Sequence, residues 1–204
     1  DVSASNLKIT GNGLTVSATA HSNALAHVCD LAIPMVSLGN VSVISTFAEA
    51  IGTVRSRVYA YSGDGINVQK GLTIQTVYSA DANSDIQPSM GGIGLLSLRV
   101  NLATARVRTK AEAGISGEGI IKVKENVLVK ADGKAKSYAV VRPTLMTAGV
   151  LNVGASTVEA TLNASQKAYA EGSRIEAQNL YVVSLYNVKD TFNGSPISNA
   201  TLDD

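Results

Sequence analysis

The stretch Gly13-Leu14-Thr15-Val16-Ser17-Ala18 recurs three times along the chain, and this recurrence decides the fold. The copies are Gly71-Leu72-Thr73-Ile74-Gln75-Thr76, Asn126-Val127-Leu128-Val129-Lys130-Ala131 and Asn179-Leu180-Tyr181-Val182-Val183-Ser184. The first apolar positions of the copies are 58, 55 and 53 residues apart (72 − 14, 127 − 72 and 180 − 127). Repeats of this length indicate a solenoid, in which each unit buries its apolar face only against its neighbours.

Each copy opens with a period-two pattern that predicts a strand. Leu14, Val16 and Ala18 face one side, while Thr15 and Ser17 face the other. A proline-to-glycine break follows in every repeat, at residues 34–39, 88–94 and 143–149. Proline cannot donate a hydrogen bond to a sheet and glycine permits a corner, so the break predicts a turn or a change of sheet.

A long extended section follows each break, at residues 41–61, 95–112 and 150–169, and is rich in Val, Thr, Ser and Ala. The stretch from Phe47 to Ile51 also scores as a helix, but Gly52 and the β-branched neighbours favour a strand. A glycine turn and a short strand, at residues 63–68, 117–123 and 171–177, then close the unit.

These patterns predict an all-β, right-handed parallel β-solenoid with about two coils per repeat, because a β-helix coil usually takes about half of such a repeat. A long-stranded antiparallel β-prism or sandwich is the alternative. The predicted units are the tail of a preceding unit (1–13), three repeats (14–71, 72–126 and 127–179) and a partial repeat with an irregular end (180–204). The structural landmarks are Gly13, Gly71, Asn126, Asn179, Pro34, Pro88 and Pro143.

Asn126 and Asn179 occupy the same turn position, so we expect them to form a hydrogen bond between neighbouring repeats. The chain begins with Asp1 rather than Met, and residues 6–9 resemble the end of a repeat. We therefore expect the chain to be part of a longer array.

Composition excludes several classes of function. The net charge is +1, from 17 basic and 16 acidic residues without long runs, which argues against a nucleic-acid partner. No apolar run reaches the roughly 18 residues of a membrane span, so we expect no membrane insertion. Cys29 is the single cysteine, so the chain has no intramolecular disulfide and no multi-cysteine zinc site. Small and β-branched residues suit thin, closely packed sheets.

Three segments carry a family resemblance: residues 36–43 (VSLGNVSV), residues 58–65 (VYAYSGDG) with residues 72–74 (LTI), and residues 147–153 (TAGVLNV) with residues 167–172 (KAYAEG). They resemble repeats of very large secreted leukotoxin-type filamentous adhesins, which are β-solenoids similar to filamentous haemagglutinin. In the second copy Glu112 stands where the other copies have Tyr. The resemblance implies a bacterial secreted or cell-surface filament, with no catalytic residues to transfer.

Candidate metal sites are weak. His21 and His27 would need Asp30 as a third zinc ligand, and surface histidines are the simpler interpretation. The turn at residues 63–65 (GDG) and the run at residues 91–94 (GGIG) resemble calcium-binding β-roll turns, but neither recurs at the nine-residue spacing of such rolls. We predict no metal and no cofactor.

Catalysis is not expected either. The carboxylates of Asp81 and Asp85 are predicted to lie on opposite sides of a bend, and no nucleophile motif is present. Tyr59, Tyr61 and Tyr169 are expected to stack between coils, or else to form an exposed adhesive strip.

The sequence therefore predicts a structural stalk segment of an adhesin, without enzymatic activity. Its partners would be neighbouring repeats or stacked copies, and a host-surface protein or glycan. A polysaccharide-binding or polysaccharide-degrading β-helix protein and a self-assembling surface fibre subunit are the alternatives.

Overall fold

The structure is a computed structural model that describes residues 2–4, 9–30, 37–62, 65–88, 94–142 and 149–188. These residues form strands joined by short connections, and none of them is helical. Phe47 to Ile51, which also scored as a helix, lie inside a strand.

The strands form three sheets in which all pairing is parallel. Sheet A contains β1 (Val2–Ala4), β4 (Ser37–Ala60), β7 (Gly94–Gly117) and β10 (Gly149–Ala170). Sheet B contains the short strands β2 (Ile9–Gly11), β5 (Gly65–Val68), β8 (Ile120–Val123) and β11 (Arg174–Glu176). Sheet C contains β3 (Leu14–Asp30), β6 (Leu72–Pro88), β9 (Asn126–Val141) and β12 (Asn179–Tyr186).

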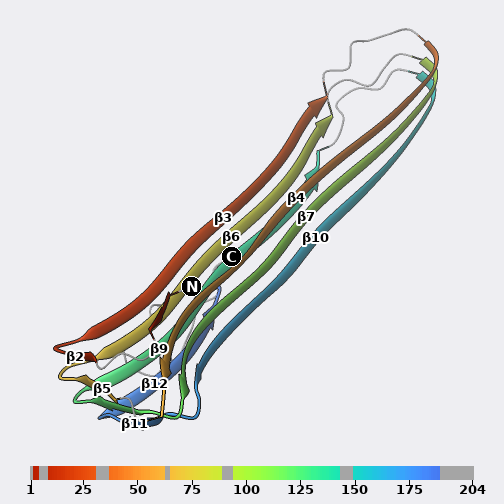
Figure 1. The fold of residues 1–204 in the computed structure, drawn as a ribbon. Helices are drawn as coiled ribbons and strands as arrows, with labels where there is room; N and C mark the ends of the chain where they lie inside the picture. The colour runs from red at the N-terminus through yellow and green to blue at the C-terminus, as the bar shows by residue number, and fades with distance from the viewer. Residues whose placement is uncertain are drawn as a thin grey trace.

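Each repeat forms one coil, because it pairs directly with the next copy of itself. In sheet C, Leu14 lies opposite Leu72, Leu72 opposite Val127, and Val127 opposite Leu180. The chain passes up sheet C, back down sheet A and across sheet B before it reaches its copy (Figure 1). The all-β parallel solenoid is confirmed, and the antiparallel alternative is wrong.

The prediction of two coils per repeat is also wrong, for a physical reason. β3 and β4 are 17 and 24 residues long, so one pair of long strands with a short third strand uses the whole repeat. The proline-to-glycine break is the change of sheet: β6 ends at Pro88, β7 begins at Gly94 and β10 begins at Gly149. Pro34 and Pro143 lie outside the described residues.

The two long sheets face each other, and sheet B joins them at one end, which we call the proximal end. At the opposite, distal end, the strands of sheet A extend beyond those of sheet C (Figure 1). Large apolar side chains from all three sheets fill the proximal end of the core, among them Val58, Ile66, Leu72, Ile74 and Ile121. This part of the core lies where the three sheets meet.

Farther from sheet B the core is thin. It consists mostly of alanine, from Ala50, Ala105 and Ala111 in sheet A and from Ala80, Ala82 and Ala135 in sheet C. Cα atoms of β4 and β6 approach within 8 Å, closer than the roughly 10 Å of ordinary stacked sheets. The expectation of thin, closely packed sheets from small residues is confirmed.

Hydroxyl groups connect the two sheets across this thin core. Ser56 Oγ in β4 donates to the carbonyl oxygen of Gln75 in β6 over 2.8 Å, and Thr76 Oγ1 in β6 donates to the carbonyl oxygen of Glu112 in β7 over 2.7 Å. Thr46 Oγ1 and Ser84 Oγ lie 2.7 Å apart. Because these short side chains reach the opposite sheet, their hydroxyl groups are satisfied without separating the sheets.

Gly52 is required by this close packing. A Cβ atom built on Gly52 would lie 2.4 Å from the hydroxyl oxygen of Tyr78, on the opposite sheet. The Tyr78 ring is 3% exposed, so it has no free space into which to move. Gly154 in β10 has nothing within 4 Å of the same position, which makes it a matched control.

We expect Gly52→Ala to destabilise the protein by about 1–3 kcal/mol, because the added methyl group overpacks the contact with Tyr78. Gly154→Ala should leave the free energy of unfolding unchanged or raise it slightly, since alanine restricts the unfolded chain at a position that can accept it. Urea unfolding followed by far-ultraviolet circular dichroism measures both. Equal midpoints for the two variants would contradict the tight contact.

Candidate functional site

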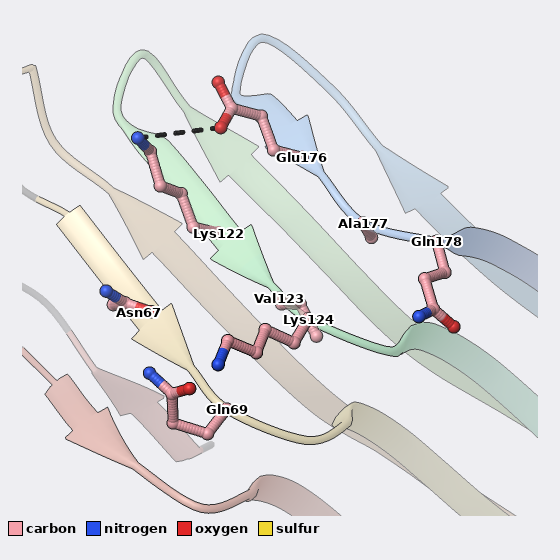
Figure 2. A pocket seen from close by; sticks show the side chains of 8 residues that line it. All are labelled: Asn67, Gln69, Lys122, Val123, Lys124, Glu176, Ala177 and Gln178. Carbon is pink, nitrogen blue, oxygen red and sulfur yellow. Dashed lines mark ion pairs between the residues drawn. The ribbon is translucent and has the colours of Figure 1, made fainter.

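A shallow groove of about 450 Å³ runs along the outer face of sheet B at the proximal end (Figure 2). Asn67, Lys122 and Glu176 stand in one row across consecutive strands, because Asn67 pairs with Lys122 and Lys122 with Glu176. Lys122 Nζ lies 3.6 Å from Glu176 Oε2. The remaining lining residues are Gln69, Val123, Lys124, Ala177 and Gln178.

The groove presents different polar groups on successive coils: the amides of Asn67 and Gln69, then the ammonium groups of Lys122 and Lys124, then the carboxylate of Glu176 and the amide of Gln178. Adjacent coils lie about 4.8 Å apart, the spacing of strands in a sheet, so polar side chains occur at regular intervals although their type changes. These groups donate and accept hydrogen bonds. The groove that they line is shallow.

The tyrosines predicted to form a ladder or strip do not share one column. Tyr59 lies opposite Ser116, whereas Tyr169 lies opposite Gly114. The rings of Tyr59 and Tyr61 contact each other within one coil, with centroids 4.6 Å apart and planes tilted by 57°. Tyr169 packs over Gly114, and Lys167 Nζ lies 4.5 Å from the centre of its ring.

The outer face of sheet A carries an ionic cluster centred on Glu112. Arg55, Glu112 and Lys167 are paired in one row across β4, β7 and β10. Glu112 accepts from Lys110 Nζ at 2.6 Å and from Arg57, and Arg55 Nε lies 2.9 Å from its carboxylate. These neighbours leave only 6% of the Glu112 side chain exposed although it points outward.

Two effects oppose each other at the Glu112 carboxylate. Burial raises its pKa, but hydrogen bonds and positive charge from Lys110 and Arg57 outweigh burial and hold the pKa at about 2. Sequence comparison missed this role because it placed Glu112 in line with tyrosines. The register instead puts Tyr169 opposite Gly114, so Glu112 belongs to a row of charges.

Further ion pairs extend the cluster: Arg106 to Glu159 and Arg108 to Glu49, each at 3.3 Å. This proximal part of the outer face of sheet A, which we call the charged zone, has more bases than acids. Its bases are Arg55, Arg57, Arg106, Arg108, Lys110 and Lys167, and its acids are Glu49, Glu112 and Glu159. The net charge of +1 for the whole chain does not reveal this local excess.

A second ionic cluster lies on the outer face of sheet C. Arg142 donates to both carboxylate oxygens of Asp85, at 3.1 and 2.8 Å. His27 Nε2 lies 3.8 Å from Asp85 and 3.5 Å from Cys29 Sγ. The hydrogen bond from Arg142 lowers the pKa of Asp85.

The cluster of Cys29, His27 and Asp85 differs from a nucleophilic triad. A triad needs one imidazole nitrogen for the nucleophile and the other for the carboxylate. Here Nε2 of His27 is the nitrogen closest to both Cys29 and Asp85. The carboxylate of Asp85 is already paired with Arg142. The geometry is that of an ionic contact between neighbouring coils.

The predicted metal ligands do not come together. His21 and His27 both face outward from β3 six residues apart, which separates them by about 20 Å. No group of three metal-binding side chains occurs among the described residues, and the side chain of Asp30 is not among them. Residues 63, 64 and 91–93 of the calcium-like turns also lie outside the described part.

Asp81 and Asp85 share one face of the continuous strand β6, so the predicted bend between them is wrong.

Among the landmarks, Asn179 Nδ2 donates to Asn126 Oδ1 over 2.9 Å, which is the predicted hydrogen bond between repeats. Gly13 and Gly71 precede β3 and β6 at equivalent corners.

Comparisons with protein-family models, curated proteins and solved structures found no match to this chain. In the described part of the chain, no helix has the length and apolarity needed to cross a bilayer.

Acid titration tests the Glu112 cluster. The pKa of about 2 in the folded protein lies below the ordinary value of 4.5, so the stabilisation is complete above pH 4.5 and is lost as the pH falls towards 2. Glu112→Gln should cost about 1–3 kcal/mol at pH 7, between the limits for exposed and buried ion pairs. The deficit should shrink between pH 4.5 and 2.

The matched control is Glu159→Gln, because the Glu159 side chain is 50% exposed in its ion pair with Arg106. It should change the free energy of unfolding by less than about 1 kcal/mol at either pH. Chemical unfolding at pH 7 and pH 2.5 gives the comparison. A Glu112→Gln deficit that is the same at both pH values would show that ionisation of Glu112 does not stabilise the fold.

Proposed function

We propose that this protein is a structural stalk segment of a bacterial secreted or cell-surface filamentous adhesin, in which stacked coils provide length. The observation that carries the proposal is the open edge formed by β10 and β12. Val158 and Leu162 in β10 and Leu180 and Val182 in β12 are 44–50% exposed. Their partners in the preceding coil, Ala103, Val107, Val127 and Val129, are at most 1% exposed.

The contrast arises because the inward side chains of β10 and β12 lack a covering coil among the described residues. A further coil, from the same or another chain, would bury them as the third coil buries those of the second. It would also pair the backbone groups at the strand edge. Stability in such arrays is a sum of interactions between neighbours, so a coil can be added without a new core design. The resemblance to adhesin repeats supports the same role.

Polysaccharide binding is the second candidate, and the groove on sheet B favours it. Asn67, Lys122 and Glu176 place an amide, an ammonium and a carboxylate group at regular intervals along the stacking direction, and each of these groups can form hydrogen bonds with sugar hydroxyls. The binding surface would lengthen with the stack. A stalk that also holds glycan is compatible with both candidates.

The stacking edge predicts assembly that one inward substitution prevents. Leu162→Asp places a charge where the next coil would pack, whereas Asn163→Asp places it on the outer face beside Arg108. Negative-stain images at rising concentration should show rods that lengthen for the wild type and Asn163→Asp, and short particles for Leu162→Asp. Wild-type particles of one constant length at all concentrations would count against stacking.

Glycan binding and turnover separate the stalk from an enzyme. If the groove binds glycans, Lys124→Ala should weaken binding on a glycan array by about tenfold, consistent with loss of a charged hydrogen bond. Lys70→Ala, outside the groove, should not. Turnover of a polysaccharide by the wild type that Glu176→Gln abolishes would replace the stalk proposal with a catalytic one.

A further inference from the structure

The distal part of the outer face of sheet A is apolar, in contrast to the charged zone. Seven large side chains form what we call the distal patch: Val41, Val43, Leu96, Leu98, Leu102, Leu151 and Val153. They align in rows across β4, β7 and β10, for example Val41, Leu98 and Val153. Their exposed fractions range from 37% to 71%.

The inward side of the same stretch is mixed: it carries polar residues and also Leu38, Ile44 and Leu95, of which Leu38 is 83% and Leu95 55% exposed. Ser42, Asn101 and Ser156 lie on the inner side, and Asn101 Nδ2 donates to Ser156 Oγ over 3.4 Å. The register between β4 and β7 continues without a bulge from Ser37 to Ala60. The outward position of the distal patch therefore follows from the alternation of the strands and not from a kink in them.

The distal patch is large enough for a specific contact. The exposed fractions of its seven side chains add up to more than three fully exposed residues, on a surface three strands wide. Soluble proteins rarely leave a contiguous apolar patch of several hundred Å² without a partner, and stable interfaces bury about 800 Å² on each side. The distal patch is therefore an exposed apolar surface of the kind that marks an interface.

We propose that the distal patch is a lateral interface with a second copy of this chain. A two-fold dimer brings the same patch of both subunits together, so an apolar patch without charges can pair with its own copy. The outward rows of the patch contain no charged residue, and a net charge of +1 leaves little repulsion between copies. This contact is independent of the stacking in the proposed function, because it uses the outer face of sheet A and not the open strand edges.

Charge selects the orientation of the pair. A two-fold axis along the strands would place the charged zones, each with six bases and three acids, against one another. An axis along the stacking direction joins only the distal patches, and the charged zones then point away from each other. This second arrangement keeps the stacking directions of the two copies parallel, so two rods can pair along their whole length.

The experiment compares Leu98→Glu with Leu25→Glu. Leu98 lies in the distal patch, and Leu25, which is 68% exposed, faces outward from sheet C. Both variants carry the same change of charge, and circular dichroism verifies that each is folded. In the Leu162→Asp background, where stacking is removed, light scattering coupled to size exclusion should give a dimer mass for the otherwise unchanged protein and for Leu25→Glu, and a monomer mass for Leu98→Glu. Val41→Glu, at the most exposed position of the patch, should repeat the result.

Leu162→Asp serves as the background for these measurements, because it removes stacking and leaves the lateral contact as the source of association. A monomer in that background at all concentrations overturns the lateral interface without affecting the stacking proposal. If Leu98→Glu and Leu25→Glu change the molar mass equally, the lateral interface is also overturned. A monomer that co-floats with phospholipid vesicles through Leu98 would assign the patch to a lipid surface and overturn pairing.

Disulfide cross-linking tests the orientation of the two copies in the pair. In the Cys29→Ser background, Tyr59→Cys places a thiol at the proximal end of the charged zone. With the two-fold axis along the stacking direction, the two thiols are about 100 Å apart, given about 3.3 Å per residue along each strand. Oxidation should then give no disulfide-linked dimer. Rapid cross-linking would contradict the parallel pairing of rods.

Discussion

Every long strand of this protein pairs in register with its own copy in the next coil, and the remaining features depend on this pairing. Each side chain therefore lies about 4.8 Å from the side chain at the equivalent position of the next coil, and neighbouring side chains in such a row must pack or pair favourably. The Asn126 to Asn179 hydrogen bond meets this condition with identical residues. The row of Arg55, Glu112 and Lys167 meets it with alternating charges, and the low pKa of Glu112 is a direct result.

The drift of the repeat from 58 to 53 residues occurs outside the strands. β3 pairs with β6 at an offset of 58 residues (72 − 14), and β4 pairs with β7 at an offset of 57 (94 − 37). The short strands β5 and β8 are offset by 55 (120 − 65). Each step of this decrease falls in a connection between sheets, because a deletion within a strand would turn its apolar face outward.

Sequence reasoning located the period, the long strands and the change of sheet at the proline-to-glycine break, because period-two alternation and backbone chemistry are local. The number of coils depends on how long a strand can run before it turns, which is a property of the whole coil. The role of Glu112 depends on register. Aligning similar residues of two repeats cannot establish that register, because an error of one residue in the alignment exchanges the two faces of a strand.

The distal patch shows the same limit most clearly. Alternation predicts that Leu96, Leu98 and Leu102 share a face, but it does not say which face meets the core. The strands of sheet C are shorter, so the distal ends of sheet A extend beyond them, and apolar side chains are exposed there on both faces, Leu38 and Leu95 on the inner one and the distal patch on the outer one. Apolar residues that would read as core in a strand alone therefore lie on the outside. In the proposed assembly, stacking and lateral pairing use perpendicular surfaces, so both can occur while the sheet B groove and the charged zone remain accessible on every coil.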